Sequence, residues 1–183
     1  SNFNIFNISQ KENYSKFDVK INLPGTKVNF IKNIKIPLIG LHNIRNSTAA
    51  TAVAFSVGIP IKIIKKGLEK FSGVQRRFTK VFSYNNVPFF DDYAHHPTEI
   101  IEVLNGVKEV YKDKEIISIF QPHRISRVKN LHEEFSKSFK KADTVILCPI
   151  YKAGENIKLG FSYNNFAKKI IKNSKVKLIL INS

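Results

Sequence analysis

With 183 residues and a hydrophobic fraction of 43%, the chain is long enough for one large or two small domains with their own cores. The sequence holds no apolar run near the roughly 20 residues of a membrane span and opens on no secretory leader, so we expect a soluble, cytoplasmic protein. Nucleic-acid binding would explain the net charge of +16. However, the lysines are spread along the whole chain, and three acidic residues that a nucleic-acid groove would avoid gather in one polar block, Asp91, Asp92 and Glu99.

The first seventy residues combine strand patterns with helix patterns. Alternation of polar and apolar residues predicts three strands, in FNIFNI near Phe3, KFDVKIN near Phe17 and KVNFIKNIKI from Lys27. Pro24 and Gly25 predict a turn before the third strand. A small-residue stretch from Asn43 to Val57 predicts a helix, and Pro60 is expected to open a second helix that runs to Phe71. We place a domain boundary here, which gives domains of residues 1–72 and 73–183.

The second domain is expected to be an α/β domain of the Rossmann-like class. Two strands, RFTKVFSY and VPFFDDY, are joined by Asn85 and Asn86, and helices and strands then alternate. Such alternation indicates βαβ units and a parallel sheet, in which ligands bind at the carboxyl ends of the strands. Cys148 lies in the apolar run TVILCPI and is expected to be a buried strand residue. The predicted elements are a helix over 97–111, a strand over 115–121, a helix over 127–140, a strand over 144–149, a helix over 164–173 and a strand over 175–181.

The block FFDDYAHHPTEI holds more polar groups than a helix start requires. Pro97 suits the first position of a helix and Glu99 the third. Helix initiation leaves five residues in succession at a strand end unexplained, Asp91, Asp92, Tyr93, His95 and His96. A metal site is disfavoured, because adjacent histidines in an extended segment point to opposite sides and no third ligand is evident. Capping and surface polarity stay open beside a substrate site, which we favour.

Arginine and histidine gather again in QPHRISR. His123, Arg124 and Arg127 fall at a predicted helix start, where the helix dipole disfavours cations unless an anion offsets them. If both arginines are helical, they lie on one face. Arginine is the side chain suited to bidentate contact with carboxylate or phosphate. We therefore favour an anion pocket over a merely basic loop.

The segment GLHNIRN places His42, Asn43 and Asn46 at the entry to the first predicted helix. Asparagine is a common N-cap residue, so one of the two could serve only to start the helix. A side-chain amide also matches the hydrogen-bonding edge of adenine. The residues alone leave both interpretations open.

Five segments in this order resemble the Mur ligase family, and within it the ligases that add L-alanine to UDP-N-acetylmuramate in bacterial peptidoglycan synthesis. They are GLHNIRNSTAATAVA, FSGVQRRF, FFDDYAHHPTEI, FQPHRISR and IYKAGE. The HNxxN and GVxRR elements are shared across the family. The QPHR segment favours the alanine-adding branch over the murein tripeptide-recycling ligases, which are similar around HHPT.

The resemblance implies that residues 1–72 end a central ATPase domain and that residues 73–183 form most of a C-terminal amino-acid-binding domain. It implies ATP, Mg²⁺, UDP-N-acetylmuramate and L-alanine as cofactors and substrates. The sequence has no GxxGKT-type phosphate loop, so the loop lysine and the metal ligands are expected outside this chain. The missing N-terminal and ATPase portions are then its partners, and the isolated chain is expected to be inactive.

The resemblance also implies roles for single residues. His42, Asn43 and Asn46 would hold adenine, and Arg77 would reach the nucleotide phosphates. Tyr93, His123, Arg124 and Arg127 would surround the alanine and the developing oxyanion, with His95 nearby and Asp91 and Asp92 orienting these groups. The residues implied in catalysis are Arg77, His95, His123 and Arg124. Two other classes remain as alternatives: a stand-alone module that binds a phosphorylated small molecule, and a nucleic-acid-binding protein.

Overall fold

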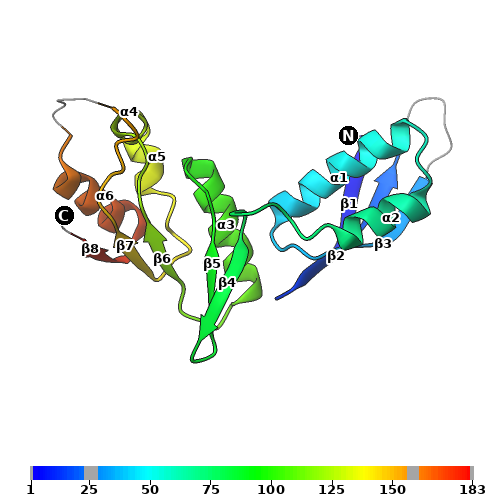
Figure 1. The fold of residues 1–183 in the computed structure, drawn as a ribbon, viewed down its shortest axis with the longest axis horizontal. Coiled ribbons are helices and arrows are strands. Elements are labelled where there is room, and N and C mark those ends of the chain that lie inside the picture. The colour runs from blue at the N-terminus through cyan, green and yellow to red at the C-terminus, as the bar shows by residue number, and fades with distance from the viewer. Residues whose placement is uncertain (1, 23–28, 156–160, 182–183) are drawn as a thin grey trace. The chain divides into compact units, whose positions relative to one another are not determined.

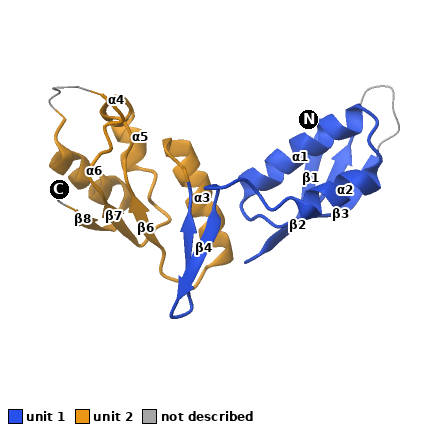
Figure 2. Cartoon of the chain, in the orientation of Figure 1, with its two compact units in different colours: residues 1–92 blue, residues 93–183 orange. Residues whose placement is uncertain are grey.

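A computed structural model describes residues 2–22, 29–155 and 161–181 of the chain (Figure 1). The chain divides into two compact units, Ser1–Asp92 and Tyr93–Ser183 (Figure 2). The predicted domain boundary at 72/73 lies before a β-hairpin that belongs to the first unit. This boundary stays a prediction. The predicted turn at Pro24 and Gly25 lies outside the described residues.

The first unit is built on an antiparallel sheet with β2 (Tyr14–Ile21) between β1 (Phe3–Lys11) and β3 (Asn29–Ile36). Helices α1 (Leu41–Ser56) and α2 (Ile61–Lys70) contact each other and the sheet (Figure 1). The three strands and two helices predicted from the sequence are therefore confirmed. The fully buried core of this unit comes from the sheet and from the start of α1, in Phe17, Val19, Ile21, Ile31, Ile34, Ile36 and Ile44.

One buried carboxylate, Asp18 on the central strand, organises both neighbouring strands. The ladder with β1 shifts register after Phe6, and the ladder with β3 shifts beside Asp18 itself. Asn7 and Asn33, at these two irregularities, have left-handed backbone angles, φ 52° and 55°, which asparagine tolerates better than most residues. The Asn7 side chain donates to Asp18 Oδ2 (2.8 Å), and the Asn33 backbone N–H donates to Oδ1 (2.7 Å). Asp18 thus fixes two β-bulges at once.

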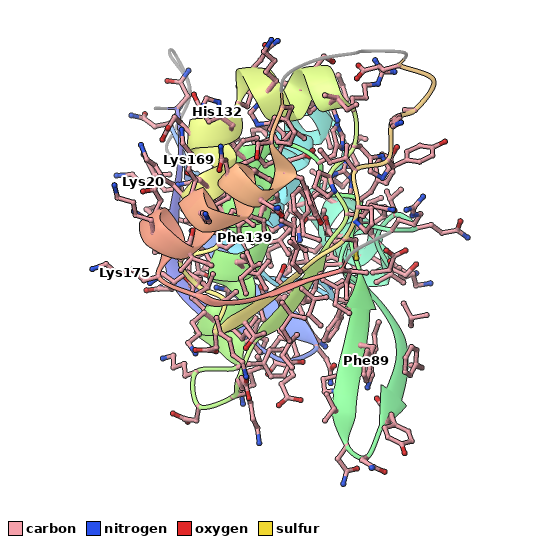
Figure 3. All side chains as sticks on the ribbon, turned by 90° about the vertical axis from the view of Figure 1, so that its left-hand side faces the viewer. Lys20, Phe89, His132, Phe139, Lys169 and Lys175 are labelled. Atoms are coloured by element: carbon pink, nitrogen blue, oxygen red, sulfur yellow. The ribbon has the colours of Figure 1, made fainter. Side chains whose placement is uncertain are left out.

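A β-hairpin follows, formed by β4 (Thr79–Tyr84) and β5 (Val87–Asp91). Asn85 and Asn86 both have positive φ, 47° and 62°, the conformation that a two-residue hairpin turn of type I′ requires. The phenylalanines stack across the strands, with Phe82 and Phe89 at 4.4 Å between ring centroids, and Phe89 projects from the hairpin (Figure 3). The hairpin and its Asn-Asn turn agree with the sequence prediction.

The second unit contains the predicted parallel sheet, in the order β6 (Ile117–Phe120), β7 (Thr144–Leu147), β8 (Lys177–Leu180). Helix α3 (Pro97–Val110) precedes β6, and α6 (Tyr163–Ser174) lies between β7 and β8 in sequence. Buried residues such as Phe139 fill the interior (Figure 3). The predicted α/β class is confirmed. Cys148 differs from the prediction, because it follows β7 and is only partly buried.

The helix predicted over residues 127–140 is instead two short helices, α4 (Ile125–Asn130) and α5 (His132–Ser136). The hydroxyls of Ser136 and Ser138 donate to the carbonyls of Glu133 and Glu134. Such bonds compete with the helix ladder. The hydroxyl of Ser174 donates to the Ser136 carbonyl and accepts from the Phe139 N–H. Tertiary contacts with α6 therefore replace helical continuation after Ser136.

Within the described residues, no helix combines the length and the apolar character that crossing a bilayer requires.

The Asp18 contacts predict an acid-sensitive contribution to stability. Its hydrogen bonds, the Asn33 N–H first, hold the pKa of the carboxyl below its ordinary value. Stability from Asp18 is therefore present above the unfolded-state pKa and is lost as pH falls through the folded-state pKa. We expect Asp18→Asn to lower the free energy of unfolding at pH 7 by about 1–2 kcal/mol, and the deficit to shrink as pH falls below about 4.

Urea unfolding of both proteins, at pH 7 and at stepwise lower pH, measures this difference. The control is Asp113→Asn, at an exposed position. A deficit that stays constant with pH would show that the charge of Asp18 is not what stabilises the bulges.

Candidate functional site

The turn after β6 is held by the segment that follows β7. His123 forms an isolated parallel bridge with Tyr151. The Arg124 N–H donates to the Tyr151 carbonyl (2.9 Å), and the Tyr151 N–H donates to the Pro122 carbonyl (2.9 Å). The parallel pairing of β6 with β7 therefore continues beyond the strands. It fixes the backbone of the QPHR segment at the carboxyl end of the sheet, where the sequence placed a ligand site.

Four aromatic rings of the second unit form a row at the carboxyl end of the parallel sheet. The Tyr93 ring lies 5.2 Å from that of His95 and 6.0 Å, edge-on, from that of His123, and the His123 ring lies 5.2 Å from that of Tyr151 (centroid distances). Tyr93 is 41% exposed and Tyr151 54% exposed. The fold thus gathers three predicted site residues, Tyr93, His95 and His123, on an accessible surface.

The two adjacent histidines have different environments. His96 is the N-cap of α3: its Nδ1 accepts from the Thr98 N–H (3.4 Å), and its own N–H donates to Glu99 Oε2 (3.1 Å). This capping box is the structural role that the sequence left open. His95 Nδ1 lies 2.9 Å from the Tyr93 carbonyl. A carbonyl only accepts, so the proton of neutral His95 belongs on Nδ1, and Nε2 carries the lone pair.

The two arginines of QPHRISR stand on either side of Ser126. Arg124 is exposed and has φ 65° and ψ 120°, so it is the residue before α4, whereas Arg127 lies in the first turn of α4 and is partly buried. The condition for a shared helix face, that both arginines are helical, is therefore not met. The left-handed φ of Arg124 sets its direction, and the Tyr151 carbonyl holds it through the Arg124 N–H.

A contact that the sequence did not suggest joins this turn to Glu155. The Ser126 hydroxyl donates to Glu155 Oε1, and the Ser126 N–H donates to Oε2 (3.1 Å). These two bonds, the hydroxyl first, hold the pKa of the Glu155 carboxyl below its usual range. The only sequence signal was that Glu155 closes the IYKAGE segment. Tyr151, from the same segment, was likewise missed as a ring neighbour.

Asp91 and Asp92 contact the segment around Arg77. Asp91 Oδ2 lies 3.4 Å from Arg76 Nε, and Asp92 Oδ2 accepts from the Phe78 N–H (2.7 Å). Arg76 and Phe78 both have left-handed φ, 58° and 50°. The exposed Arg77 is thus bracketed by two positions that the aspartates hold. The aspartates therefore contact the residues on both sides of Arg77, in the first unit. That they orient the groups around the alanine stays a prediction.

His42, Asn43 and Asn46 lie in the first two turns of α1. The N-cap of α1 is Gly40, with φ 92°, so neither asparagine starts the helix. Asn43 Nδ2 donates to the Ile39 carbonyl (2.7 Å), whereas Asn46 is exposed. The His42 ring packs over Gly40, where an added Cβ would lie 2.7 Å from His42 Cε1. Close packing and positive φ both require glycine at position 40.

The candidate residues thus form two sets. His42, Asn43, Asn46 and Arg77 belong to the first unit, and Tyr93, His95, His123, Arg124 and Arg127 belong to the second. In the part of the chain that the structure describes, no three His, Cys, Asp or Glu side chains gather as metal ligands would.

Comparison with known proteins places this arrangement in a family. Residues 76–181 match the model of the glutamate ligase domain of the Mur ligases. The chain belongs to the Mur ligase family. It is 66% identical, over 99% of its length, to the UDP-N-acetylmuramate–L-alanine ligase of Pelagibacter ubique, of which it covers 39%. The corresponding ligase of Rickettsia bellii is 45% identical over 91% of this chain.

Solved structures agree on the fold. The crystal structure of a UDP-N-acetylmuramate–alanine ligase from Thermotoga maritima matches the whole chain, with a TM-score of 0.78 and 28% identity, and this chain covers 37% of it. A murein peptide ligase from Psychrobacter arcticus matches with a TM-score of 0.59 and 23% identity, which shows a shared fold only. The chain spans about two fifths of the length of these relatives.

The different contacts of Asn43 and Asn46 predict different effects on stability. In Asn43→Asp the donor to the Ile39 carbonyl is lost and a carboxylate oxygen faces that carbonyl, so we expect the free energy of unfolding to fall by roughly 1–2 kcal/mol. Asn46→Asp, at an exposed position near the helix N-terminus, should change it by less than about 0.5 kcal/mol. Thermal unfolding of both variants tests this. Equal melting temperatures would contradict the Asn43 contact.

Proposed function

We propose that the chain is part of an ATP-dependent ligase that joins L-alanine to UDP-N-acetylmuramate in peptidoglycan synthesis, and that it carries the end of the ATPase domain and most of the amino-acid-binding domain. The observation that carries the proposal is the 66% identity to a ligase of that name over 99% of this chain. The gathering of Tyr93 and His123 at the carboxyl end of the parallel sheet supports it, and the backbone of Arg124 is held there by Tyr151. The carboxyl end is where α/β sheets bind ligands.

The second unit would hold the alanine. A free α-amino acid presents a carboxylate, which the guanidinium groups of Arg124 and Arg127 suit. It also presents an ammonium group, which must lose a proton before its nitrogen can attack. His95 Nε2, left as an acceptor by the Nδ1 contact with Tyr93, could take that proton. His123, between the rings of Tyr93 and Tyr151, would border the reacting carboxyl.

Cationic groups are what this reaction requires. A carboxylate is a poor electrophile until phosphorylation converts it to an acyl phosphate. Attack of the amine then forms the C–N bond and creates a tetrahedral centre with a negatively charged oxygen. Collapse of this centre breaks the bond to the phosphate, which leaves. Positive groups fixed before the reaction stabilise that oxygen without reorganisation. We assign the positive charge to Arg124, a place beside the same oxygen to His123, and the contact with the nucleotide phosphates to Arg77.

The first unit would contribute to the ATP site. Asn46 is exposed on α1 and could pair with adenine, with His42 and Asn43 shaping the same surface. ATP supplies the phosphoryl group, and Mg²⁺ would offset the charge of its phosphates. We assign the Mg²⁺ ligands to the parts of the longer enzyme outside these 183 residues. Those parts would be its partners, together with UDP-N-acetylmuramate, and nucleotide substrates favour the cytoplasm as its location.

The first prediction concerns the chain by itself. Incubated with ATP, Mg²⁺, L-alanine and UDP-N-acetylmuramate, the 183 residues should release no phosphate, because the sequence has no GxxGKT-type loop to hold the β- and γ-phosphates. A complete ligase that contains this chain should form UDP-N-acetylmuramoyl-L-alanine. If it accepts a tripeptide instead of L-alanine, the murein-recycling alternative is correct. Phosphate release by the chain alone, dependent on both substrates, would contradict the prediction.

The second prediction concerns Arg127. In the complete ligase, Arg127→Lys should raise the KM for L-alanine roughly tenfold to a hundredfold and leave the KM for ATP unchanged, because an ammonium group cannot reproduce a bidentate carboxylate contact. Arg45→Lys, at an exposed position of α1, is the matched control. An unchanged KM for L-alanine in Arg127→Lys would remove Arg127 from the alanine site.

A further inference from the structure

A tight turn after β7 directs Glu155 back towards the start of α4. The Glu155 N–H donates to the Lys152 carbonyl (3.0 Å), which closes the turn. Its two central residues, Ala153 and Gly154, both have left-handed φ, 51° and 81°. Glycine adopts this conformation freely, whereas alanine does so at a cost in conformational energy. The turn therefore keeps a strained residue, Ala153, two positions before the glutamate that delivers the carboxylate.

Glu155 supplies the cap that α4 lacks from its own sequence. No side chain caps α4 locally, because its N-cap position is held by Arg124, whose side chain has no acceptor. The first N–H groups of a helix have no partner inside the helix. Glu155 accepts from the N–H of Ser126 and from its hydroxyl. A carboxylate from a different segment thus does the work of an N-cap side chain.

The charge of Glu155 strengthens this cap. The hydroxyl and the N–H of Ser126 have the largest effects and lower the pKa of Glu155. Desolvation opposes them, and the N–H of Ile125 and the charge of Arg124 add smaller lowering effects. The group is therefore ionised at neutral pH. Hydrogen bonds to an ionised acceptor are stronger than those between neutral groups.

The same segment holds the arginine turn from its other side. Tyr151 receives the Arg124 N–H and donates its own N–H to Pro122. Residues 151–155 therefore contact the backbone before Arg124, at Arg124 and after it, at Ser126. The direction of each arginine side chain depends on this backbone.

We infer that Glu155 is a positioning residue for Arg124 and Arg127, and that through Ser126 it sets how the two guanidinium groups meet the carboxylate of the amino acid. The inference rests on the proposed function. Because Ser126 donates to both oxygens of Glu155, the carboxylate is engaged by serine. The Glu155 carboxylate therefore holds the turn in place and does not take the position that we assign to the carboxylate of the substrate.

Two variants of Glu155 separate positioning from charge. In Glu155→Gln the amide oxygen can accept from the Ser126 N–H while the amide nitrogen donates to the Ser126 hydroxyl, which also accepts. Both contacts with Ser126 therefore remain, while the negative charge of residue 155 is lost. In Glu155→Ala both bonds are lost. In the complete ligase, we expect Glu155→Ala to raise the KM for L-alanine about tenfold, with the KM for ATP unchanged, and Glu155→Gln to stay within about twofold of the wild type.

Amide exchange in the 183-residue chain measures the contact between Ser126 and Glu155 independently of catalysis. Hydrogen exchange of the Ser126 amide, followed by NMR, should be slow in the wild type and in Glu155→Gln and fast in Glu155→Ala. Glu134→Ala, which removes an exposed carboxylate from α5, is the matched control and should change neither the exchange nor the kinetics.

Two results would overturn the inference: an unchanged KM for L-alanine in Glu155→Ala although the Ser126 amide exchanges fast, or equal increases in the KM values of all three substrates. Failure of the proposed function looks different. The complete wild-type ligase would then not use L-alanine at all, while Ser126 exchange would still respond to Glu155→Ala.

Discussion

The geometry of the residues that we propose for the alanine site depends on the backbone pairing that extends the β6–β7 ladder past the ends of the strands. Strand bonds place the two chain segments side by side, and the His123–Tyr151 bridge continues this register into the loops. A loop that carries charged side chains is normally the most mobile part of an α/β domain. Here the bonds at Pro122, Arg124 and Ser126 make the loop part of the sheet's framework.

Local sequence patterns were enough for most elements and insufficient for the helix over 127–140 and for the loops. Alternation and turn residues predicted the strands and the Asn85–Asn86 hairpin, because these depend on neighbours in sequence. The end of α5 at Ser136 depends on Ser174, far along the chain. The left-handed φ of Arg124 depends on Tyr151. Neither can be read from a helical periodicity.

The candidate site divides along the same line. The sequence selected Tyr93, His95, His123, Arg124 and Arg127 by chemistry and by resemblance, and the fold brings three of their rings into one row. The sequence could not select Glu155, because a single glutamate after a glycine carries no signal until its distance to Ser126 is known. It also left open the starting point of α1, which close packing of His42 on Gly40 decides.

The bulges around Asp18 constrain the register of the strands in the first unit. A one-residue slip of an antiparallel strand turns its inward side chains outward. Because Asn7 and Asn33 both reach the same carboxylate, neither outer strand can slip against β2 without losing its bond to Asp18. The central strand therefore sets the register of both outer strands. An added or deleted residue in β1 or β3 must therefore be accommodated away from Asn7 or Asn33 if the bond to Asp18 is to be kept.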